Sequence, residues 1–137
     1  MLYSKLYERL YSLRVKIAKT TGEFFSFRPN RLYLIAIVLL QFLTWWGAYY
    51  IYNNIGTNLL VLHYNVDFGI DWIGSQSDIF YFPLVGLVSF LISVILLFIF
   101  GPGKNFRIHS NYLMMKTILT NLGMLMSLLL IYIINFR

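Results

Sequence analysis

Residues 79–100 read IFYFPLVGLVSFLISVILLFIF, a run without a charged side chain. An α-helix of about 20 apolar residues is long enough to cross the ~30 Å hydrocarbon core of a bilayer. Two more runs of similar length and character cover residues 32–52 and 112–135. The sequence therefore predicts an all-α integral membrane protein, in which an N-terminal segment (1–31) precedes a three-span membrane domain (32–137).

The overall composition supports this class. Hydrophobic residues make up 59% of the 137-residue chain and charged residues only 12%, whereas soluble domains carry about 25% charged residues. A soluble fold of this size would expose too much surface to hide so many apolar side chains. The chain has no cysteine, which excludes disulfides, thiolate metal ligands and cysteine nucleophiles.

The basic residues predict how the chain is oriented in the membrane. Residues 1–31 contain seven Lys and Arg and two Glu, a net charge of +5. Residues 53–78 have three Asp and no Lys or Arg, whereas residues 101–116 have three basic residues. Basic residues stay on the cytoplasmic side during insertion. We therefore expect a multi-pass protein of the cytoplasmic (inner) membrane, with the N-terminus inside and both the 53–78 loop and the C-terminus outside.

The N-terminal segment is expected to form an amphipathic helix at the membrane interface. At 100° per residue, one face collects the apolar residues Leu2, Leu6, Leu10, Leu13 and Ile17. The other face collects most of the charged residues, namely Lys5, Glu8, Arg9, Lys16 and Lys19. Such a helix buries its apolar side at the acyl boundary, while its cations attract anionic lipid. It either sets the topology or provides a docking surface, and its apolar face argues against nucleic-acid binding.

Apolar and polar residues alternate strictly along residues 62–72 of the outer loop. Alternation of period two over this length predicts a β-strand with one apolar and one polar face. Gly69 within it suggests a bulge or a close backbone approach. Because a lone strand leaves its backbone groups unpaired, this strand needs a partner. That partner is either the segment 57–61, folded back on it, or a strand of another subunit.

The same loop carries a recognisable series of residues: Leu62-His63-Tyr64-Asn65, Phe68-Gly69-Ile70-Asp71 and Ile73-Gly74, followed by an apolar span. This series resembles a loop between spans in small uncharacterised integral membrane proteins of candidate-phyla bacteria. The third span and the basic N-terminal segment lie outside the resemblance. What it implies is a bacterial module of span, patterned outer loop and span, with no catalytic residues to carry over.

Three residues of the loop are weak candidates for a metal site: His63, Asp67 and Asp71. On one strand they share a face, and imidazole with carboxylates suits a divalent cation. Neighbours in this set would be about 13 Å apart at strand spacing, too far for one ion unless the chain bends. We therefore expect a solvated polar face, without a metal, a cofactor or an enzymatic activity.

Polar and aromatic residues remain as candidates for contacts with other proteins. Within the spans, amide and hydroxyl side chains can hydrogen-bond between neighbouring helices. In the loop, aromatic side chains form the apolar edge of the predicted strand. The candidates are Gln41, Asn121 and Ser127 in the spans, and Tyr64, Phe68 and Trp72 in the loop.

These features favour a structural or interaction role. No charged residue lies deep within a span, although proton and ion pathways usually need such groups. The sequence therefore predicts an accessory or scaffolding subunit of a membrane assembly, which contacts other membrane subunits or further copies of itself. The alternative is an oligomeric pore or transport component, lined by the polar residues of the third span.

The predicted orientation has a direct test. A reporter enzyme that is active only outside the cytoplasm should be active when it is fused after Arg137 and inactive when it is fused after Lys104, because the two sites face opposite sides. Reporter activity in cells is the measurement. The reverse pattern, or equal activity at both sites, would contradict the orientation.

Overall fold

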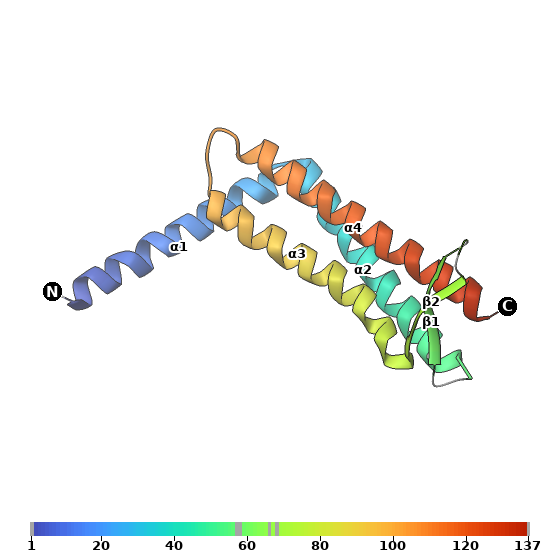
Figure 1. Ribbon diagram of the computed structural model, residues 1–137. Coiled ribbons are helices and arrows are strands. Elements are labelled where there is room, and N and C mark those ends of the chain that lie inside the picture. Colours follow the sequence, from blue (N-terminus) through green and yellow to red (C-terminus); the bar gives the residue numbers. More distant parts are fainter. Residues whose placement is uncertain (1, 57–58, 66, 68, 137) are drawn as a thin grey trace.

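Four α-helices, a short 3-10 helix and a β-hairpin make up the part of the chain that the structure, a computed structural model, describes: residues 2–56, 59–65, 67 and 69–136. In chain order the elements are α1 (Leu2–Ser26), α2 (Arg28–Asn54), β1 (Leu59–Asn65), β2 (Gly69–Ser75), η1 (Gln76–Phe80), α3 (Tyr81–Phe100) and α4 (Phe106–Asn135). Helices α2, α3 and α4 run side by side as a bundle (Figure 1). Helix α1 leaves this bundle at one end, and the hairpin lies at the other.

The three bundle helices correspond to the predicted spans. By length and composition, three of the described segments are able to cross a membrane: Arg28–Asn54, Gln76–Phe100 and Phe106–Asn135. Helices α2 and α3 each pack along α4 and contact one another much less. The structure thus confirms a mostly helical chain with three helices long and apolar enough to span a bilayer.

Local sequence explains where the helices begin and end. Pro29 lies in the first turn of α2 and Pro83 in the first turn of α3, where a missing N–H costs no helical hydrogen bond. The Asp78 carboxylate accepts a 2.8 Å hydrogen bond from the Ser75 backbone N–H and so starts η1. Helix α3 ends at Gly101 with φ +65°, a backbone conformation that glycine adopts without strain.

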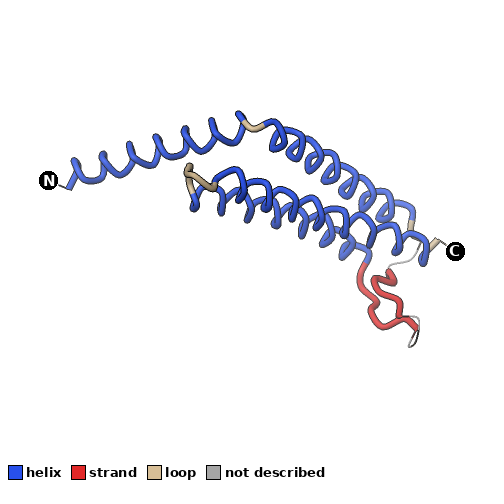
Figure 2. Tube along the Cα trace, turned by 90° about the horizontal axis from the view of Figure 1, so that it is seen from above, coloured by secondary structure: helices blue, strands red, loops and turns tan. Residues whose placement is uncertain are grey.

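Helices α1 and α2 are joined by one extended residue. Phe27 (φ −90°, ψ 111°) alone separates them. The fully buried Asn30 holds this junction, because its Nδ2 donates to Phe24 O at 3.2 Å and to Ser110 Oγ at 3.1 Å. One amide thus ties α1, α2 and α4 together. Beyond it α1 leaves the end of the bundle at an angle (Figure 1), and the view from above shows it extending past that end (Figure 2).

The bundle has two apolar clusters, one towards each end. The cluster at the hairpin end contains Ala48, Ile51, Leu60, Leu62, Ile79, Leu128 and Ile131. The cluster at the α1 end contains Ile37, Leu97, Phe106, Leu113 and Met114. The cluster at the α1 end takes side chains from all three bundle helices, whereas the cluster at the hairpin end takes them from α2, β1, η1 and α4, with the partly buried Phe82 of α3 packed against it. The two clusters therefore fill the interior of the bundle towards both ends.

The prediction of one strand over residues 62–72 is wrong. The chain reverses within this stretch, and β1 and β2 pair as an antiparallel two-stranded sheet in which Tyr64 lies opposite Ile70. Gly69 begins β2 with φ +80°, a left-handed conformation suited to a tight reversal. The partner strand is therefore β2 of the same chain, and neither the segment 57–61 nor a second subunit is needed to supply it.

The hairpin is fixed to the bundle by apolar burial and by one amide. Leu60 and Leu62 of β1 are buried in the apolar cluster at the hairpin end. The Asn135 side chain, at the end of α4, accepts from Val61 N–H at 3.0 Å and donates to Val61 C=O at 2.9 Å. The amide therefore occupies both backbone groups of one residue, as a neighbouring strand would.

Asn135→Ala should loosen the hairpin without opening the bundle. It removes both bonds to Val61, and an unsatisfied buried polar group costs about 1–3 kcal/mol. Amide hydrogen exchange should therefore speed up in β1 and stay unchanged in the middle of α3. The control is Asn53→Ala, because the Asn53 side chain donates to Tyr49 O of its own helix. Equal exchange in the two variants would contradict the role of Asn135.

Candidate functional site

A layer of polar side chains crosses the middle of the bundle. Along each of the three helices it lies between the two apolar clusters. Its buried members come from α2, α3 and α4: Thr44, Ser89, Ser93, Thr117 and Asn121. We call this set, together with the half-buried Gln41, the polar layer.

Hydrogen bonds across the polar layer join neighbouring helices. The hydroxyl oxygens of Ser93 and Thr117 lie 2.8 Å apart and link α3 to α4. Either hydroxyl can donate, and the other then donates to a backbone carbonyl of its own helix. The Gln41 Nε2 donates to Pro83 O at 2.7 Å and links α2 to α3. The layer therefore ties all three helices to one another.

Gly86 of α3 makes room for two amides. A Cβ at this position would lie 2.5 Å from Asn121 Oδ1 and 3.0 Å from Gln41 Oε1. The two oxygens therefore converge on one point of α3, and no donor among the described residues reaches either of them. Asn121 donates through Nδ2 to Thr117 O at 2.9 Å. Because Gly86 has no side chain, the Asn121 and Gln41 amides can both pack against its backbone.

The polar layer is electrically neutral. The buried polar side chains that the structure describes are Ser, Thr and Asn, and none of them carries a charge. General acid–base catalysis requires a titratable group near the reacting atoms. The layer is therefore suited to joining helices, because a buried hydrogen bond between them removes polar groups that hydrocarbon cannot solvate.

The structure separates the residues that the sequence proposed for contacts with other proteins. Asn121 is fully buried and Gln41 is half-buried, and both amide oxygens lie against Gly86 of α3 within one chain, although we expected these residues at a contact with another subunit. Ser127 and the exposed Trp72 line one hollow between α4 and the hairpin. Phe68 and the side chain of Tyr64 lie outside the described residues.

The weak metal candidates do not form a described cluster. His63 and Asp67 are exposed, on β1 and in the turn after it, and the side chain of Asp71 lies outside the described residues. In the part of the chain that the structure covers, no three His, Asp or Glu side chains are placed to hold a metal ion. The hairpin thus brings no metal site together among these residues.

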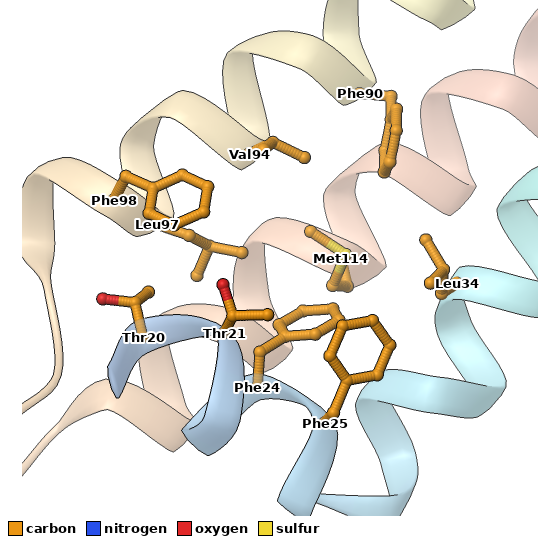
Figure 3. Close-up of a pocket in the computed structure, with 10 residues that line it drawn as sticks. All are labelled: Thr20, Thr21, Phe24, Phe25, Leu34, Phe90, Val94, Leu97, Phe98 and Met114. Carbon is orange, nitrogen blue, oxygen red and sulfur yellow. The ribbon is translucent and has the colours of Figure 1, made fainter. Parts of the chain in front are cut away.

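A crevice opens where α1 meets the bundle, and the sequence did not single out its residues. Its volume is about 180 Å³, and all four helices line it: Thr20, Thr21, Phe24 and Phe25 from α1, Leu34 from α2, Phe90, Val94, Leu97 and Phe98 from α3, and Met114 from α4. Figure 3 shows these side chains gathered around one apolar space. One sequence signal does point to it, because Thr20 and Phe24 continue the apolar face of Leu13 and Ile17 at helical spacing.

A second hollow continues the crevice along α1 and α3. Its volume is about 530 Å³, and it is lined by Leu13, Lys16, Ile17, Ile95, Phe98 and Ile99. Phe98 lines both spaces. Among the described residues that line the two, Lys16 is the charged one; its Nζ donates to Ile99 O at 3.2 Å. Its stem passes over Gly101, where a Cβ would meet Lys16 Cε at 2.7 Å.

Comparisons of the chain with known proteins found no match. No protein-family model matches the chain, and no curated protein and no solved structure matches it. The resemblance of the 62–74 stretch to bacterial membrane proteins therefore stays a prediction.

Gly86→Ala should destabilise the bundle, whereas Gly123→Ala should not. The new methyl group at position 86 would displace both amide oxygens, and overpacking of this kind costs about 1–3 kcal/mol. Nothing lies within 4 Å of a Cβ at Gly123, so the second variant should be neutral or slightly stabilising. Thermal unfolding of the two variants in one detergent is the measurement. An equal unfolding temperature for both would contradict the packing of the polar layer.

Proposed function

We propose that the protein is an accessory or scaffolding subunit of a membrane assembly. The observation that carries the proposal is the closed interior of the bundle. Hydrogen bonds of the polar layer join the helices inside the chain, and the amide oxygens of Gln41 and Asn121, which no described donor reaches, lie against Gly86. An apolar cluster lies on each side of the layer. The surfaces offered to other molecules are therefore α1 at one end and the hairpin at the other.

The arrangement of the ends supports the proposed orientation. Helix α1 and the connection from α3 to α4 lie at the same end of the bundle, and the hairpin and the C-terminal end of α4 lie at the other (Figure 1). The first end thus collects both basic segments, 1–31 and 101–116, while the acidic segment 53–78 belongs to the second. A cytoplasmic basic end follows from the retention of Lys and Arg on that side.

Helix α1 fits the proposed role of a membrane-surface helix on anionic lipid. Leu6, Leu10, Leu13 and Ile17 are each 51–59% exposed, so about half of each apolar side chain is left open by the described chain. Because α1 leaves the bundle at an angle (Figure 1), this face can lie at the acyl boundary while the spans cross the bilayer. Its basic face is then available to the headgroups and to a partner.

The hairpin supplies the proposed contact on the other side. Ile70, Trp72 and Ile73 of β2 are each 52–56% exposed. Successive side chains of a strand point to opposite faces, so β2 exposes apolar side chains on both sides, and such side chains are candidates for an interaction surface. We therefore place the partner's outer contact on β2.

The pore alternative has less support from the geometry. Thr117 and Asn121, the centre of the polar stripe of α4, are fully buried against α2 and α3. A pore between several copies would need these side chains to face outwards. The side chains that do line the outer face of α4 are mostly apolar, among them Leu119, Met126 and Leu130.

Purification in a mild detergent tests the proposal. The tagged protein should bring down a different membrane protein at a constant ratio, identified by mass spectrometry. Trp72→Ala should lower that ratio, because it removes the largest exposed side chain of β2. The matched control is Trp46→Ala, a Trp of similar exposure on α2. Isolation of the chain as a solitary monomer would contradict the proposal.

A further inference from the structure

We propose that the crevice between α1 and α3 binds one acyl chain of an anionic phospholipid, with the headgroup held at Lys16. The inference rests on the proposed function only in placing the basic end of the bundle at the membrane surface. The proposed function includes only the nonspecific attraction of basic residues to anionic lipid. The inference adds a defined binding site and a defined ligand.

The deep part of the crevice suits a hydrocarbon chain. Leu34, Phe90, Val94, Leu97, Phe98 and Met114 supply its apolar walls, and Phe24 and Phe25 reach into it from α1 (Figure 3). The space lies where α1 meets α3, and Leu34 of α2 and Met114 of α4 complete its lining. An apolar space of this kind gains nothing from water, whereas a flexible chain can fill it.

The depth of the crevice matches one leaflet. From Ile99, next to Lys16 Nζ, to Phe90 the axis of α3 advances about 13 Å at 1.5 Å per residue. One leaflet contributes about half of the ~30 Å hydrocarbon core. A chain that starts at the level of Lys16 can therefore extend beside α3 to Phe90 without leaving its own leaflet.

The headgroup end carries the charge that an anionic lipid needs. Lys16 is exposed and lines the outer hollow, and one of its N–H groups is directed to Ile99 O. An ammonium has three donors, so two remain for a phosphate oxygen. The remaining residues that line the hollow are apolar. A single cation at the mouth of an apolar crevice complements a molecule with a negative head and a greasy tail.

A helix from another protein fits the crevice less well. A helix with its side chains is about 10–12 Å across, and the enclosed part measures about 180 Å³. One extended acyl chain is much thinner. The surrounding lipid also supplies such chains at a concentration that no protein partner reaches.

Native mass spectrometry of the purified full-length chain tests this inference, with phosphatidylglycerol and phosphatidylcholine of identical acyl chains as probes. The chain should retain phosphatidylglycerol about fivefold better, as expected for one cation near the headgroup. Val94→Trp, which fills the crevice, should abolish this retention. Val88→Trp is the matched control, because Val88 is 50% exposed on α3 and does not line the crevice. Lys16→Gln should remove the headgroup preference, and Lys5→Gln should keep it.

Equal retention of the two lipids, or an equal effect of the two Trp variants, would overturn the inference. A second measurement covers the case in which Val94→Trp does not fold. Phosphatidylglycerol with a photoreactive acyl chain should label the unmodified chain at Phe25, Val94 and Phe98. Labelling spread evenly over the outer faces of α2, α3 and α4 would count against the site. Both measurements use the isolated chain, so their failure is distinct from a failure to find a partner protein.

Discussion

Hydrocarbon cannot form hydrogen bonds, and this constraint accounts for the structure of the three bundle helices. Backbone groups at membrane depth have to be paired within the chain, which helices α2, α3 and α4 achieve between their first and last turns. Several side-chain polar groups follow the same rule, because Ser93, Thr117 and Gln41 Nε2 bond to neighbouring helices or to backbone carbonyls. Among the described residues, the buried Gln41 Oε1, Asn121 Oδ1 and Ser89 Oγ depart from it. Outside the spans, the two strands of the hairpin pair with each other, and Val61 of β1 also bonds to Asn135.

The two ends of the bundle have different surfaces. At one end the Asn30 side chain fixes the junction between α1 and α2, and α1 extends from the bundle with one apolar and one basic face. At the other end the hairpin is anchored by Leu60 and Leu62 and exposes the side chains of β2. A closed interior with two differently charged outer surfaces fits a protein that positions other molecules at a membrane.

Sequence reasoning found the spans because length and apolarity are local properties. It did not find the hairpin, since strict alternation is the same in one long strand and in two paired strands, and Gly69 alone hinted at the reversal. The polar stripe of α4 showed which residues share a face, but the packing that buries Asn121 against Gly86 depends on α2 and α3. The crevice depends on the direction that α1 takes at Phe27, which no local pattern specifies.

The central claim is that lipid surrounds the outer faces of α2, α3 and α4. Because the chain has no cysteine, a spin label can be attached to a single cysteine at Leu119 or Met126, both exposed on α4. In bilayers, paramagnetic relaxation should show frequent collisions with oxygen, which dissolves in hydrocarbon, and few with a water-soluble nickel chelate. A label at Lys104 should show the opposite. Strong collisions with the nickel chelate at Leu119 and Met126 would contradict the account.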